Sequence, residues 1–190
     1  MGGEKAFEAI VTASKHENPK VRVAAARGLG QMKKKKAFEP LAELIKDEDP
    51  DVRCSAVEAL SKLDDKRTVD LFITALSDKS HSVQFAALRA LKHYGRKFDN
   101  ERIVEPLASA LSIHDYRIRL EAAKALYYLG DGRGIDVIAN NYIYEKDSAR
   151  ENLVWIAGNI KNKSIIGFLF EATKDPDQNV RIEAVKGLRG

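Results

Sequence analysis

Apolar residues recur along the chain in a helical pattern that repeats six times. The clearest copy, DPDVRCSAVEALSKL, begins at Asp49. Its apolar residues fall at the spacing of one helix face, and they are Val52, Ala56, Val57 and Leu60. The small residue before the usual arginine marks each copy, at spacings of 31, 31, 35, 31 and 31: Val21, Val52, Val83, Ile118, Ala149 and Val180. Such regular spacing indicates a repeat protein.

A second apolar pattern precedes each copy and keeps the same register. Its central residues are Ile10, Leu41, Phe72, Leu107, Ile138 and Leu169. The pattern predicts helices near 6–13, 38–45, 69–76, 103–111, 135–143 and 165–172. The helices that follow begin with capping residues, most clearly at Asp49-Pro50, because an aspartate N-cap and a proline at the first position favour a helix start. Each repeat is therefore predicted to be a pair of helices.

A helix pair of this length cannot bury its apolar face alone, so successive pairs must stack and share a core. The sequence predicts an all-α fold, an α-solenoid of about six two-helix repeats with a 31-residue period, forming one domain over residues 1–190. The units are expected at about 1–32, 33–63, 64–98, 99–129, 130–160 and 161–190. A four-residue insertion near 94–100 lengthens one connecting loop, because the helical patterns on both sides of it are intact.

The repeat carries a family resemblance. Asp-x-x-Val-Arg is followed by Ala-x-x-Ala-Leu, and preceded by helices such as FEPLAELIKDEDP (38–50) and IVEPLASAL (103–111). This arrangement resembles the short HEAT-like repeats of the phycobilisome-lyase type. The resemblance implies the solenoid fold for the whole chain. It does not imply one function, because that family includes scaffolds, bilin-lyase subunits, a metal hydroxylase and DNA-repair proteins.

Composition excludes several classes of protein. Of the 190 residues 44% are hydrophobic and 32% are charged, which supplies a continuous core. No apolar run approaches the roughly 20 residues of a membrane span, and the first residues lack a secretory signal, so we expect a cytoplasmic protein without membrane contact. The single cysteine, Cys54, excludes an internal disulfide. Of the four histidines only His16 precedes a glutamate, and no cluster has metal-ligand spacing, so no enzyme, metal or cofactor is expected.

An arginine recurs directly after the marker residue. It is present in five of the six copies as Arg22, Arg53, Arg119, Arg150 and Arg181, with Gln84 in the remaining one. Acids occur at matching positions in the turns, as Asp47, Asp78 and Asp175. A guanidinium bonds a carboxylate through two parallel N–H groups, so we expect these residues to link neighbouring repeats rather than to contact nucleic acid.

The second helix of each unit also carries positions that stacking does not require. In HEAT-like solenoids they face the concave surface, and the candidate partner-binding residues there are Phe85, Arg89, Leu120, Lys124, Tyr128 and Trp155. Trp155 is the sharpest candidate, because the other five copies have a charged residue at its position. Aromatic residues and arginine dominate protein interfaces. The alternative is a local repacking that turns Trp155 inward, since Leu153 and Ala157 invert the usual small and large residues of the helix.

The net charge of +4, with a pI of about 9.0, is distributed unevenly. Loops that follow the second helices form a basic edge, whose candidate residues are Lys33, Lys34, Lys35, Lys36, Arg67, Arg96 and Lys97. Such an edge could follow a phosphate backbone or be only a solvated surface.

We interpret the chain as a non-enzymatic scaffold that binds a protein or peptide in its concave groove. Nucleic-acid binding along the basic edge and a bilin-lyase-like, enzyme-associated subunit are the alternatives. The identity of the partner and the oligomeric state do not follow from the sequence.

Overall fold

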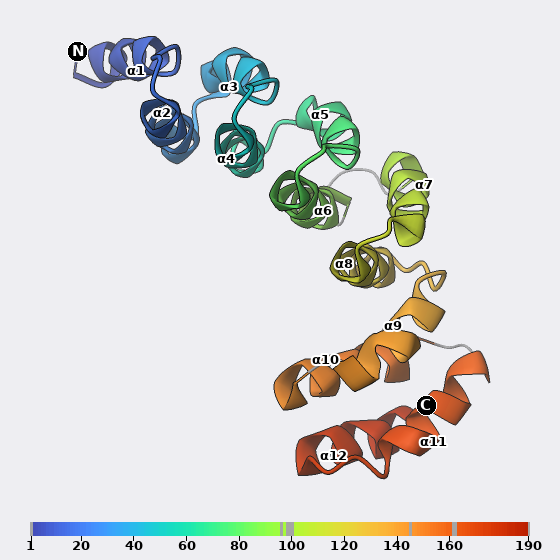
Figure 1. Ribbon diagram of the computed structural model, residues 1–190. Helices are drawn as coiled ribbons and strands as arrows, with labels where there is room; N and C mark the ends of the chain where they lie inside the picture. The colour runs from blue at the N-terminus through green and yellow to red at the C-terminus, as the bar shows by residue number, and fades with distance from the viewer. Residues whose placement is uncertain (1, 96, 98–100, 145, 161–162, 190) are drawn as a thin grey trace. The chain divides into compact units, whose positions relative to one another are not determined.

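The computed structural model describes residues 2–95, 97, 101–144, 146–160 and 163–189, and these form an α-solenoid of helix pairs (Figure 1). The described residues contain no strand, and their α-helices are α1 (Gly2–Ala13), α2 (Pro19–Met32), α3 (Phe38–Leu44), α4 (Pro50–Leu60), α5 (Thr68–Ala75), α6 (His81–Gly95), α7 (Glu101–Ser109), α8 (Tyr116–Tyr128), α9 (Ile135–Asn141), α10 (Asp147–Gly158), α11 (Ile166–Ala172) and α12 (Gln178–Gly187). The predicted all-α fold is confirmed.

The second helices begin at the capping residues that the sequence indicates. The Asn18 side chain accepts a hydrogen bond from the Lys20 N–H at 2.9 Å. Asp49 accepts from the N–H groups of Asp51 and Val52, and a proline follows each of these two caps. Asp115 and Asp177 cap α8 and α12 in the same way. These side chains satisfy N–H groups that the first turn leaves without an intrahelical partner.

Contacts divide the chain into two compact units, Met1–Ile103 and Val104–Gly190. In the first unit α1, α3 and α5 form one layer, and α2, α4 and α6 form the other (Figure 1). Helix α4 packs against both α2 and α6, and α3 packs on α4. The leucines that the repeat places between the layers, Leu29, Leu60 and Leu91, are fully buried.

Glycine sets the distance between α2 and α4. A Cβ added at Gly30 would lie 2.8 Å from the Cα of Ala59. The two second helices therefore approach more closely than any larger residue allows.

In the second unit α10 packs on α12, and α11 packs on both of them. The predicted size inversion in α10 is present: Leu153 and Ala157 are both fully buried. Helices α10 and α12 also approach closely, because a Cβ on Gly158 would lie 2.7 Å from the Cα of Gly187. The inversion leaves the core filled, and it does not turn Trp155 inward, because that side chain is 40% exposed.

The predicted arginine ladder is present in three copies, and each arginine reaches the acid of the following repeat. Arg53 donates from Nε and Nη2 to the two carboxylate oxygens of Asp78, at 2.8 and 2.9 Å. Its Nη1 donates to the carbonyl oxygens of Asp47 and Glu48 in the turn before its own helix. Arg22 with Asp47 and Arg150 with Asp175 repeat the carboxylate pairing.

Burial alone would raise the pKa of the Asp78 carboxyl, but the hydrogen bond from Arg53 and the N–H of Ser80 outweigh it and lower that pKa. The pKa of Asp47 is lowered by the same balance, with Arg22 and the N–H of Asp49 as its donors. Both carboxylates are therefore charged in the folded protein at neutral pH.

The ladder has two substitutions. Gln84 replaces the arginine in α6, and its buried Oε1 has no hydrogen-bond donor among the described residues. Arg119 donates to the carbonyl oxygens of Ile113 and His114, but the residue 25 positions after it is Tyr144 instead of an aspartate. Arginine and acid are thus matched in some repeats and not in others.

Candidate functional site on the second helices

The ladder occupies Arg22 and Arg53, so the available side chains of the first unit lie on the opposite side of its second helices. They form three rows across α2, α4 and α6. The half-buried apolar row is Val23, Cys54 and Phe85; the exposed charged row is Arg27, Glu58 and Arg89; and the polar row is Gln31, Lys62 and His93. Each row takes one residue from each repeat, because the repeats keep one register.

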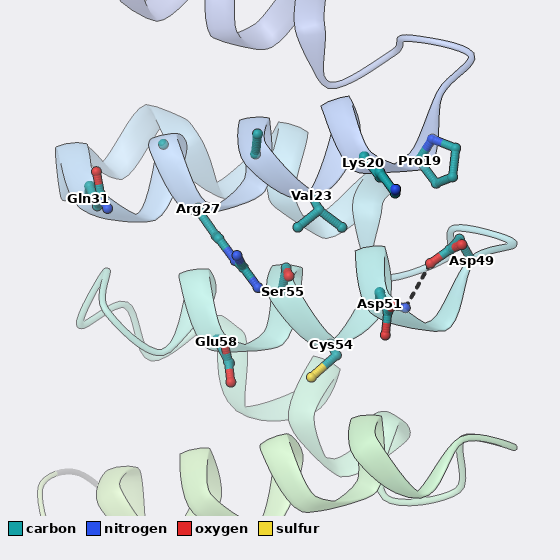
Figure 2. A pocket seen from close by; sticks show the side chains of 12 residues that line it. Pro19, Lys20, Val23, Arg27, Gln31, Asp49, Asp51, Cys54, Ser55 and Glu58 are labelled. Atoms are coloured by element: carbon teal, nitrogen blue, oxygen red, sulfur yellow. Dashed lines mark hydrogen bonds between the residues drawn. The ribbon is translucent and has the colours of Figure 1, made fainter.

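A hollow of about 820 Å³ lies between α2 and α4 on this surface. Figure 2 shows Val23 and Arg27 projecting from α2 over it. Cys54 and Glu58 of α4 line its other side. The hollow exists because Ala24, Gly28 and Ser55 contribute little side chain to its wall.

A second hollow, of about 340 Å³, lies between α4 and α6 and includes the predicted contact residue Arg89. Glu58 lines both hollows, so they adjoin on the same surface. The charges of the shared row alternate along it as Arg27, Glu58 and Arg89. The surface is therefore a groove across three helices with a positive, a negative and a positive group.

Cys54 is a packing residue of the groove and not a reactive thiol. Burial raises the pKa of its thiol, and the charges of Glu58 and Asp51 raise it further. The protonated thiol is a weak nucleophile at neutral pH.

Trp155 provides the corresponding feature of the second unit. Its ring contacts Tyr127 edge to face, with 6.0 Å between centroids, and Tyr127 contacts Tyr128 in the same manner. A hollow of about 190 Å³ beside Trp155 is lined by α10 and α12, with Glu183 and Lys186 among its residues. Tyr127 was missed by the sequence prediction, although its signal is an aromatic residue where other repeats have glycine, serine or lysine.

The structure does not place all predicted contact residues at the surface. Leu120 is only 4% exposed and packs in a cluster with Leu153 and Ile156. The prediction that it faces a partner is therefore corrected: the large Leu153 covers it. Lys124 and Tyr128 are half-buried. Phe85 and Arg89 belong to the first unit, and Lys124, Tyr128 and Trp155 to the second.

Sequence comparison decides the family. A model of HEAT repeats matches residues 7–92 and 69–148, which together exceed half of the chain. The chain belongs to the HEAT-repeat family. No curated protein matches it in sequence.

Solved structures resemble this HEAT-repeat chain over nearly its whole length. The Escherichia coli protein YibA has a TM-score of 0.76 and 23% identity, covering 98% of this chain and 68% of that one. A designed armadillo repeat protein in complex with the peptide (KR)4 has a TM-score of 0.71 and 17% identity, covering 95% and 97%. An engineered protein has a TM-score of 0.69 and 21% identity, covering 96% and 97%. At these identities the similarities establish the fold alone.

Most described cations of the basic edge bind groups of the HEAT repeats themselves. Lys36 pairs with Glu4 and lies 4.1 Å from the Phe7 ring centroid. Arg67 bonds both carboxylate oxygens of Asp65. The remaining predicted residues are Lys33, exposed; Lys34, which donates to the Gly3 carbonyl oxygen; Lys35, exposed; Lys97, paired with Asp64 at 2.6 Å; and Arg96, which lies outside the described residues. Neighbouring acids thus neutralise much of this edge.

Two further searches bear on the alternatives. Over the described residues, no three His, Cys, Asp or Glu side chains gather in a way that could hold a metal ion. None of the helices in that part of the chain has the length and apolarity to cross a membrane.

Proposed function

We propose that this HEAT-repeat chain is a non-enzymatic scaffold and that the groove across α2, α4 and α6 binds an extended segment of a partner protein. The observation that carries the proposal is the charged row Arg27, Glu58 and Arg89. These three side chains line the two hollows and make no ion pair within the described part of the chain. Charged groups left without partners along an apolar groove favour a ligand of complementary charge.

The row also indicates what the segment contains. Neighbouring helices pack about 8–10 Å apart, and an extended chain advances about 3.3–3.6 Å per residue, so two or three ligand residues span one repeat. The complementary segment has an acidic, then a basic, then an acidic residue at that spacing. Because this order reads the same from both ends, the expectation holds for either chain direction. Apolar ligand residues between the charges would lie on the row of Val23, Cys54 and Phe85.

A second contact surface is proposed at Trp155 in the second unit, with Lys124, Tyr127 and Tyr128 beside it. An exposed tryptophan held by a neighbouring aromatic ring provides a large contact area with little loss of side-chain entropy. The peptide complex of the designed armadillo repeat protein shows that a related fold can hold a peptide. That precedent supports the class of ligand, while the charge order comes from this chain.

Selection of displayed peptides on the full chain tests the groove. We expect enrichment of the acid–base–acid order, and affinity for a selected peptide that falls at least about tenfold in R27E and R89E, because each reversal repels an acid of the ligand. Lys66→Glu is the matched control, since it changes the net charge equally at an exposed lysine outside the groove. Peptides without the charge order, or equal losses in K66E, would refute the proposal. Trp155→Ala tests the second surface separately.

Nucleic-acid binding is not favoured, because acids pair with Lys36, Arg67 and Lys97.

A further inference from the structure

The last helix pair exposes large apolar side chains on one face. Ile166 and Phe170 of α11 are 53% and 57% exposed, and Val185 and Leu188 at the end of α12 are 43% and 39% exposed. We call these four residues the end face. Exposed residues of this size grouped on one helix pair indicate an interaction surface.

The same positions in earlier repeats show what covers such a face. Val185 corresponds by repeat register to Val57 and Val154, which are fully buried. Leu188 corresponds to Leu60 and Ala157, which are also fully buried. Each of these counterparts is followed by another repeat of its unit, whose second helix packs on its own, as α6 packs on α4 and α12 on α10. The end face therefore has the composition of an internal stacking surface.

Arg181 is the ladder arginine of this last pair, and only half of its bonding pattern is present. Its Nη1 donates to the carbonyl oxygens of Asp175 and Pro176, both at 2.8 Å, as Arg53 does in its own turn. In Arg53 the other two donors, Nε and Nη2, bind the aspartate 25 positions later. Among the described residues no acid binds those donors of Arg181. The end face thus joins an apolar surface to a guanidinium directed as in the stacked repeats.

We propose that the end face binds a helix pair of the HEAT type from a partner protein, and that this pair carries an aspartate in the turn between its helices. The aspartate bonds Nε and Nη2 of Arg181, and apolar residues of the pair cover Phe170, Val185 and Leu188. The inference extends the interface already present between repeats and is independent of the groove on α2, α4 and α6.

A second copy of this chain fits the end face poorly. Its first repeat has His16 where the other ladders have Asp47 or Asp78. The Nδ1 of His16 accepts the turn hydrogen bond from the Asn18 N–H at 3.0 Å, as the Asp47 carboxylate does for Asp49, but imidazole offers no two-oxygen acceptor to a guanidinium. Helix α1 also exposes polar or small residues, including Glu4, Glu8 and Thr12, instead of large apolar ones.

The chain's own second repeat can serve as a surrogate for the partner. Joining a copy of residues 32–63 directly after Gly190 places its Asp47 25 positions after Arg181, the separation seen in Arg22–Asp47. Covalent attachment supplies this helix pair at high local concentration. With Cys54→Ser in both copies and Val185→Cys as the probe, we expect thiol labelling to slow at least about tenfold when the pair is attached. The thermal midpoint should rise by roughly 4 °C or more.

The matched control changes Asp47 to Ala in the attached copy alone, and it should lose much of both effects while that helix pair remains intact. Unchanged labelling of Val185→Cys after attachment would overturn the proposal, as would an Asp47→Ala copy that protects equally well. Sedimentation of the unmodified full chain tests the competing occupant. We expect no self-association through the end face, and a dimer that Phe170→Asp abolishes would show a second copy as the occupant instead.

Discussion

Removing Arg53 should destabilise the protein more than any exposed substitution of equal size. The perturbation is Arg53→Met, which keeps the length of the side chain and removes its donors. The side chains of Arg53 and Asp78 are 6% and 13% exposed, so both are largely withdrawn from water. The variant leaves Asp78 charged and buried, with the N–H of Ser80 as the remaining donor of its printed bonds.

The magnitude follows from which bonds are lost. Breaking a buried ion pair by removing one partner costs about 3–5 kcal/mol. The carbonyl oxygens of Asp47 and Glu48 also lose Arg53, but the exposed turn lets water replace it there. We therefore expect the lower end, about 3 kcal/mol, which is roughly a hundredfold change in the folding equilibrium.

Urea unfolding followed by circular dichroism measures this cost. The double variant Arg53→Met with Asp78→Leu should recover much of it, to within about 1.5 kcal/mol of the parent, because no buried carboxylate is left unpaired. Lys62→Met, at an exposed position of α4, should change stability by less than about 0.5 kcal/mol. A cost below about 1 kcal/mol for Arg53→Met, or a double variant as unstable as the single one, would refute the role given to the ladder.

Three further predictions concern stability. The lowered pKa values of Asp47 and Asp78 lie below their unfolded values, so their contribution is complete above roughly pH 4 and is lost as the pH falls further, which urea midpoints at pH 7 and pH 3 would detect. Gly30→Ala should cost about 1–3 kcal/mol because its Cβ meets the α4 backbone, whereas Gly28→Ala, whose Cβ would lie 3.4 Å from a side-chain atom, should not; equal midpoints would contradict this. Gln84→Met should raise the unfolding free energy by about 1 kcal/mol by removing an unpaired buried oxygen, and a loss of stability would show that this oxygen has a partner.

The fold could be predicted from the sequence because stacking requires the same residue types at the same positions in every repeat. The register that aligns Leu41 with Phe72 also aligns α3 with α5, and the caps at Asn18 and Asp49 begin α2 and α4 where predicted. The ladder was predictable for the same reason, since one arginine and one aspartate recur at fixed positions.

The candidate site was predicted only in part, because exposure depends on neighbours in space. Trp155 is exposed as one alternative required, but Leu120 is covered by Leu153, which lies in the next repeat. The largest hollow lies in the first two repeats, where small residues such as Gly28 leave space. A search for unusual large residues passes over such positions.

The ladder has a consequence for how the protein can change. Stability rests on internal positions such as Arg53, Asp78 and Leu60, whereas the groove takes one residue of each kind from each repeat. Substitution of Arg27 or Glu58 therefore leaves the stacking interface untouched. Specificity can be rewritten one helix at a time, so exchanging whole repeats within the first unit offers a combinatorial route to receptors for other charge sequences.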